Sequence, residues 1–221
     1  MQFRRQCACC LSGQWPNLES RMNWYEEEVL RVEKEAEKLA FTPETIFYGS
    51  SSFTLWETLY TDFEDLNPVN LGFGGSTLAA CSWFFDRIMA QLDQPKTMLI
   101  YAGDNDLGDG RNPMEVCIFY RELLAQIRTR FGAIPCYYIS IKPSIQRWEL
   151  LAEIKTTNQL IRQETEKDQL QHFVDIFPAM LGADGRPVKS LFEADGLHLS
   201  PAGYAVWEKE IREALRLTDH P

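Results

Sequence analysis

The sequence predicts a three-layer α/β/α fold built around a parallel sheet. From Thr45 onward, short apolar segments alternate with longer segments in which apolar residues recur at helical spacing. Two of the short segments, 98–101 and 137–139, are continuous apolar runs. Such runs are typical of strands buried on both faces, and strands that alternate with helices favour a parallel sheet covered on both sides.

An amphipathic helix precedes this alternation. Between residues 18 and 39, apolar residues recur at helical spacing: Trp24, Val29, Val32, Ala36 and Leu39. The helix must end before Thr42-Pro43, because the residue before a proline avoids helical conformation. We therefore divide the chain into an N-terminal tail with this helix (1–40) and a single α/β domain (41–221). The apolar stripe would either brace the domain or form a homodimer contact.

The domain then runs through strands and helices in turn. Strands are expected at 45–48, 69–72 (strand or turn), 97–102, 135–141 and 173–177. Helices are expected at 52–62, 77–92, 114–131, 145–168 and 201–217. The last helix has the clearest start, because Ser200 is a preferred N-cap residue and Pro201 suits the first helical position.

Composition narrows the class of protein. The chain has 221 residues, of which 45% are hydrophobic and 24% charged, which suits one globular domain. Its 22 basic and 32 acidic residues give a net charge of −10, which disfavours nucleic acid and anionic membranes as the main partner. No apolar run approaches the roughly 18 residues of a membrane span, and the first 15 residues lack a signal-peptide core, so we expect a cytoplasmic protein.

Six cysteines fit a reducing compartment. Cys81, Cys117 and Cys136 fall in apolar segments, where single buried thiols are common. Cys7, Cys9 and Cys10 are crowded near the N-terminus, but a second Cys/His cluster to complete a four-ligand zinc site is lacking. We therefore predict no metal site there.

Polar and glycine-rich segments follow the strands, and ligands bind beyond the carboxyl ends of strands in such sheets. The segments are 49–52 (Gly-Ser-Ser-Ser), 70–76 (Asn-Leu-Gly-Phe-Gly-Gly-Ser), 103–110 (Gly-Asp-Asn-Asp-Leu-Gly-Asp-Gly) and 142–144 (Lys-Pro-Ser). The first, taken alone, is typical of a turn into a capped helix, and the last of a simple connection.

Two alternative sites match poorly. The glycines of 72–75 lack the third glycine and the later acidic residue of a dinucleotide site. Segment 104–115 has Asp104, Asp106 and Glu115 at calcium-loop positions, but Gly108 and Asp109 occupy a ligand position and the sharp-turn position.

A candidate base lies downstream. Asp195 and His198 are three residues apart on a predicted turn, so the carboxylate can orient the imidazole and stabilise its charged form. The other histidines are His172, at the start of a strand, and His220, in the C-terminal tail. His198 is therefore the candidate.

Four blocks, at residues 49–51, 70–75, 103–106 and 195–198, resemble in this order those of the SGNH (GDSL-type) hydrolase family. The resemblance covers roughly residues 45–216. The resemblance implies a flavodoxin-like five-stranded parallel sheet, with Ser51 as nucleophile, His198 as base and Asp195 as its orienter. It implies an oxyanion hole formed by Ser51, Gly75 and the Asn105 amide, and neither a cofactor nor a metal. The implied substrate is a small-molecule ester with a short acyl or acetyl group.

The sequence departs from the family pattern at Ser50, where aspartate is common. That raises the question of whether Ser50 or Ser52 could replace Ser51. The alternative hypothesis is a non-catalytic module that uses the same cleft to bind a carbohydrate or a protein. A binding module, however, has no chemical need for all five of the residues Ser51, Gly75, Asn105, Asp195 and His198.

Overall fold

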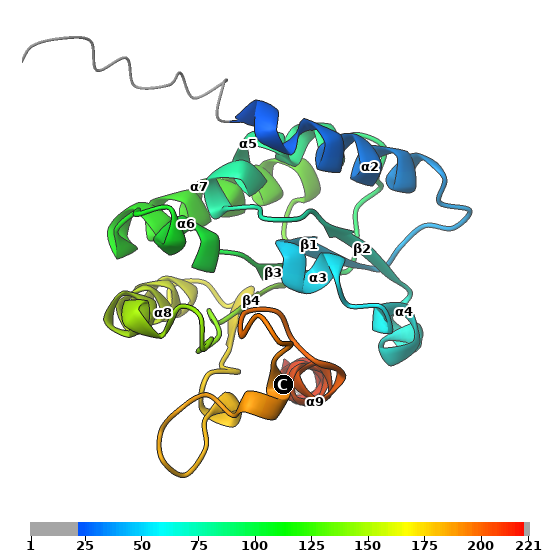
Figure 1. Cartoon of the computed structure of the whole chain (residues 1–221). Coiled ribbons are helices and arrows are strands. Elements are labelled where there is room, and N and C mark those ends of the chain that lie inside the picture. Colours follow the sequence, from blue (N-terminus) through cyan, green and yellow to red (C-terminus); the bar gives the residue numbers. More distant parts are fainter. Residues whose placement is uncertain (1–21, 219–221) are drawn as a thin grey trace, which may run out of the picture.

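Five parallel strands form one sheet in the computed structural model of the chain, which describes residues 22–218 (Figure 1). The strands are β1 (Thr45–Gly49), β2 (Pro68–Gly72), β3 (Thr97–Tyr101), β4 (Cys136–Ile139) and β5 (Gln171–Val174). Their order across the sheet is β2-β1-β3-β4-β5, and every neighbouring pair is parallel. This is the flavodoxin-like arrangement implied by the resemblance.

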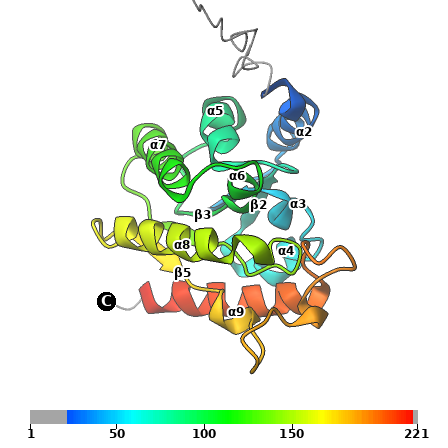
Figure 2. The same cartoon turned by 60° about the vertical axis from the view of Figure 1, so that its left-hand side comes forward.

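Helices cover both faces of the sheet, as Figures 1 and 2 show. The longer helices are α2 (Glu26–Glu37), α5 (Leu78–Ile88), α7 (Pro113–Phe131), α8 (Leu151–Thr165) and α9 (Pro201–Thr218). Three short helices follow strands or turns: α3 (Ser51–Thr54), α4 (Leu59–Asp62) and α6 (Asp104–Gly108). Short 3-10 turns lie at Asn23–Tyr25, Glu64–Leu66, Trp148–Leu150, Pro178–Met180 and Lys189–Leu191.

Each central strand contributes to two apolar cores. In β3, Met98 and Ile100 join the core formed with α2, α5, α7 and α8, whereas Leu99 and Tyr101 join the core formed with α3, α4 and α9. All four side chains are fully buried. This explains why the strand has no polar alternation in sequence.

Helix α2 braces the domain. Val29 and Val32 are fully buried in the first core. Arg31 donates a hydrogen bond to the carbonyl of Gly72 over 2.9 Å, and the Gly74 N–H donates to Glu28 over 2.9 Å. The helix is thus attached to the glycine-rich loop after β2, which is the bracing role.

Some expected elements differ from the observed ones. The helix expected at 52–62 is two short helices, α3 and α4. The helix expected at 145–168 begins at Leu151 after a 3-10 turn, and residues 104–108 form helix α6. The fifth strand ends at Val174 rather than residue 177. Ser200 caps α9 as expected, since its Oγ accepts a hydrogen bond from the Gly203 N–H at 3.3 Å.

Cys81, Cys117 and Cys136 are buried free thiols, as the sequence predicts. Cys7, Cys9 and Cys10 lie outside the described residues. Between residues 22 and 218, no helix is both long and apolar enough to cross a membrane.

Candidate active site

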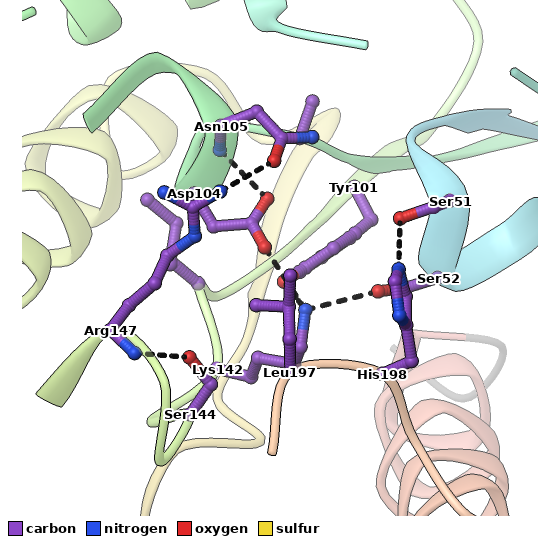
Figure 3. Close-up of polar contacts among 12 residues, drawn as sticks. Ser51, Ser52, Tyr101, Asp104, Asn105, Lys142, Ser144, Arg147, Leu197 and His198 are labelled. Atoms are coloured by element: carbon purple, nitrogen blue, oxygen red, sulfur yellow. Dashed lines mark hydrogen bonds and ion pairs between the residues drawn. The ribbon is translucent and has the colours of Figure 1, made fainter. Parts of the chain in front are cut away.

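Ser51 is the first residue of α3, directly beyond the carboxyl end of β1. The turn between β1 and α3 requires glycine at position 49. There φ is +155°, and an added Cβ would lie 1.9 Å from the Tyr101 carbonyl oxygen. The same oxygen accepts a hydrogen bond from the Ser50 N–H at 2.8 Å. Ser51 Oγ lies 3.2 Å from His198 Nε2 (Figure 3).

Asp195 and His198 lie in the turn before α9. Asp195 Oδ1 accepts hydrogen bonds from the N–H groups of Leu197 at 2.9 Å and His198 at 3.0 Å. Its other oxygen, Oδ2, lies 2.6 Å from His198 Nδ1. The Leu197 N–H bond, followed by the His198 contacts, lowers the pKa of Asp195 to about 2 even though partial burial opposes the shift.

The contacts fix the protonation of the imidazole. An ionised carboxylate only accepts hydrogen bonds, so neutral His198 carries its proton on Nδ1 beside Asp195. Nε2 is then the acceptor that faces Ser51 Oγ. A hydroxyl in that position can pass its proton to the ring as it attacks an electrophile.

Gly75 and Asn105 line one cavity of about 380 Å³. Gly75 follows β2 and has φ +68°, a left-handed conformation that favours glycine. Asn105 belongs to α6, and its Nδ2 donates a hydrogen bond to the Ser76 carbonyl at 3.1 Å. Arg147 Nη2 donates to Asn105 Oδ1 at 3.0 Å, which fixes the orientation of the amide (Figure 3).

Two cavities flank His198 and the oxyanion candidates. The first, beside Gly75 and Asn105, is also lined by Trp24 and Tyr25 from the segment that leads into α2. The second, of about 290 Å³, is lined by His198 itself together with Leu55, Glu57, Thr58, Glu193, Leu199, Pro201 and Tyr204.

The structure brings the predicted residues Ser51, His198 and Asp195 into contact and places Gly75 and Asn105 on one cavity. The sequence did not single out three other residues near them. Lys142 was interpreted as part of a simple connection, yet its amino group is buried beside Ser52 and Asp104. Arg147 was assigned only to a helix. Trp24 was assigned to the apolar stripe, but it is 71% exposed and covers Gly75, whereas Tyr25 is buried.

The calcium-like segment, which already matched a calcium loop poorly in sequence, makes other contacts in the structure. The carboxylates of the calcium-like segment bind protein groups: Asp104 accepts from Lys142 Nζ, and Asp106 accepts from the Leu78 N–H at 2.7 Å. Among residues 22–218, no group of three or more His, Cys, Asp or Glu side chains is arranged to hold a metal.

The fold and the matched blocks define the class of protein, which is a hydrolase with a three-layer α/β/α fold. Residues 45–206 match the GDSL-like Lipase/Acylhydrolase family, and the chain belongs to it.

Two mammalian proteins of similar sequence are acetylhydrolase subunits by name. Platelet-activating factor acetylhydrolase IB subunit alpha1 of Homo sapiens is 25% identical over 169 residues, which are 73% of this chain and 71% of that protein. The same subunit of Bos taurus is also 25% identical, over 169 residues that make up 73% of this chain and 70% of that protein.

Solved structures share the fold. A GDSL-like lipase from Bacteroides thetaiotaomicron superposes with a TM-score of 0.72 at 20% identity, covering 85% of this chain and 97% of that one. A carbohydrate esterase family 3 protein from Talaromyces cellulolyticus gives 0.60 at 17% identity, covering 80% and 98%.

Proposed function

We propose that the protein is a serine esterase that cleaves short-chain acyl or acetyl esters through an acyl-enzyme on Ser51. The observation that carries the proposal is the continuous series of contacts from Asp195 Oδ2 to His198 Nδ1, and from His198 Nε2 to Ser51 Oγ. A serine hydroxyl becomes an effective nucleophile when such a base takes its proton.

In the first half of the reaction, Ser51 Oγ attacks the ester carbonyl carbon while His198 Nε2 accepts the Oγ proton. The tetrahedral intermediate then collapses, the bond to the leaving alcohol breaks, and His198 returns the proton to that alcohol. In the second half, His198 takes a proton from water, the resulting hydroxide attacks the acyl group, and Ser51 Oγ leaves with the proton. Asp195 stabilises the imidazolium in both halves.

The negative charge on the carbonyl oxygen would be bound by the N–H groups of Ser51 and Gly75 and by the Asn105 amide. Arg147 supports this role for Asn105, because its hydrogen bond to Oδ1 directs the amide nitrogen toward the loop of Gly75 and Ser76. Removing one such donor from a serine hydrolase typically costs about 10²–10³ in rate.

The positions of the two cavities suggest how an ester would lie. The leaving alcohol receives its proton from His198, so it would occupy the cavity that His198 lines. Glu57 and Glu193 line the same cavity, which favours a neutral or cationic alcohol over an anionic one. The acyl group would extend into the cavity beside Gly75 and Asn105, and the acetylhydrolase name of the relatives supports a small acyl group.

The test combines a reactive probe with substrates of graded length. Wild-type protein should be labelled by a fluorophosphonate and should hydrolyse aryl esters, with the highest kcat/KM for the shortest acyl chains. Ser51→Ala should lose both activities while remaining folded. Ser50→Ala is the matched control, because Ser50 Oγ is buried and has no hydrogen-bond partner among the described residues.

The outcomes separate the two functional hypotheses. Labelling that survives in Ser51→Ala would contradict Ser51 as nucleophile. An unlabelled, inactive wild type that still binds a carbohydrate or a protein would favour the non-catalytic module. Ser52 is a poor replacement for Ser51, since its side chain is buried against Lys142 and the histidine contact is made by Ser51 Oγ.

A further inference from the structure

Lys142 has a buried amino group beneath the candidate active site. Its side chain is only 1% exposed. Nζ donates hydrogen bonds to Ser52 Oγ at 3.1 Å, Tyr101 Oη at 3.0 Å and Asp104 Oδ2 at 3.0 Å (Figure 3). An ammonium has three N–H donors, so these three acceptors satisfy it completely.

The partners of Lys142 belong to three different elements. Ser52 lies in α3, one residue after the candidate nucleophile, and Asp104 is the first residue of α6, one residue before Asn105. Tyr101 ends β3. The ammonium therefore joins the helix of the nucleophile to the helix of the oxyanion donor through one atom.

The connection continues to Asn105 itself. Asp104 Oδ1 accepts a hydrogen bond from the Asn105 backbone N–H at 3.1 Å while Oδ2 binds Lys142. Burial would raise the pKa of Asp104, but the charge and hydrogen bond of Lys142 lower it below its ordinary value. The carboxylate is thus held ionised and fixed at both oxygens.

Stability alone is a weak reason for such an arrangement. Desolvation of a buried ion pair offsets much of its attraction, and apolar replacements of similar size are often as stable. What an apolar pair cannot reproduce is the directional link between α3 and α6. Lys142 also neutralises the carboxylate next to Asn105, which would otherwise disfavour a developing oxyanion nearby.

We propose that Lys142 is a positioning residue for the reaction, which sets the geometry between Ser51 and Asn105 through Ser52 and Asp104. This inference rests on the proposed esterase function. It predicts that loss of the ammonium affects the chemical step more than substrate binding, because Lys142 acts through residues beside the nucleophile and the oxyanion donor.

The test uses Lys142→Met and the double variant Asp104→Asn/Lys142→Met, in which the buried charges are both removed. Each is assayed for kcat and KM on an aryl acetate, for the rate of fluorophosphonate labelling, and for unfolding by urea. Lys142→Met should lower kcat and the labelling rate about 10²-fold, as misplacement of catalytic groups commonly does, with KM changed less than about 3-fold.

The double variant separates positioning from folding. It should regain resistance to urea, because no unpaired charge is buried, but kcat should remain about 10-fold or more below wild type. Arg128→Met is the control: it removes the partly buried pair with Asp168, in the turn before β5, and it should weaken folding without lowering kcat of the folded protein.

Recovery of urea resistance and kcat together in the double variant would contradict the positioning role. A wild-type kcat in Lys142→Met would also contradict the positioning role. A wild type that neither hydrolyses the ester nor reacts with the probe would contradict the proposed function and this role with it, whereas an active wild type beside an unaffected Lys142→Met would contradict this role alone.

Discussion

Asp195 Oδ2 lies 2.6 Å from His198 Nδ1, and the two residues belong to one turn whose backbone N–H groups also bind the same carboxylate. The turn therefore supplies both the charge and the orientation of the imidazole. Local backbone bonds hold the carboxylate in place even though its side chain is 45% exposed.

Asp195→Asn is expected to lower kcat by roughly 10⁴, because an amide in this position favours the wrong tautomer of His198. With a pKa of about 2, Asp195 is ionised above about pH 4. Its carboxylate contributes to folding stability above the ordinary aspartate pKa, and that contribution is lost as the pH falls toward 2. Steady-state kinetics on an aryl acetate between pH 5 and 9 measure the loss of activity.

Asp184→Asn is the matched control for this change. Asp184 also accepts a backbone N–H, from Arg186 at 3.0 Å, in an exposed turn. It should keep wild-type kcat. An Asp195→Asn variant within tenfold of wild type at every pH would show that His198 does not depend on this carboxylate.

Arg147→Met should lower kcat about 10- to 10²-fold, because Asn105 Oδ1 loses the donor that orients its amide. Arg147→Lys should recover little of this loss, since lysine keeps the charge but not the guanidinium geometry. Arg121→Met, which breaks an exposed ion pair between α7 and α8, is the control and should be fully active. Wild-type kcat in Arg147→Lys would indicate that the charge of Arg147, and not its geometry, supports Asn105.

The fold and the contact of Asp195, His198 and Ser51 could be predicted, because the patterns behind them are local in the sequence. Continuous apolar runs identified the strands, and Gly49, Ser51, Asp195 and His198 occur in short blocks with fixed spacing. The break between α3 and α4 could not be predicted. There, the Trp56 side chain donates to Asp62 and packs against Tyr204 of α9, a contact between residues that are far apart in the sequence.

The supporting groups of the site depend on long-range contacts. Lys142 meets partners that are 38 to 90 residues away in the chain, and Arg147 meets Asn105 across 42 residues. The sequence around Lys142 contains no spacing that indicates these contacts. Its polar turn after a strand was therefore indistinguishable from an ordinary connection.

Asp106 is expected to make folding stability depend on pH. Its side chain is fully buried, and burial raises its pKa to about 6 although the Leu78 N–H bond opposes the shift. The folded protein therefore holds this proton more tightly than the unfolded chain. Its stabilising effect is complete below about pH 4 and is lost as the pH rises to about 6.

Urea unfolding of wild type and Asp106→Asn between pH 4 and 8 tests this effect. Relative to the variant, wild type should lose about 3 kcal/mol of unfolding free energy over this interval, at about 1.4 kcal/mol per pKa unit. A difference between the two proteins that stays constant with pH would show that Asp106 titrates normally.

Trp24 is expected to determine which acyl groups the protein accepts. Its ring covers Gly75, where an added Cβ would lie 2.7 Å from the indole, and it lines the cavity beside Asn105. Trp24→Ala should therefore open this cavity. We expect kcat/KM for butyryl and hexanoyl aryl esters to rise several-fold relative to acetyl, while kcat for acetyl changes little.

Trp83→Ala is the matched control, because Trp83 is a tryptophan on α5 that is 47% exposed and does not line the cavity. It should leave the order of acyl preference unchanged. Trp24 is itself mostly exposed, so its removal should alter the unfolding free energy by less than about 1 kcal/mol. An unchanged preference in folded Trp24→Ala would mean that the acyl group lies elsewhere, and the cavity that His198 lines would then be the alternative acyl site.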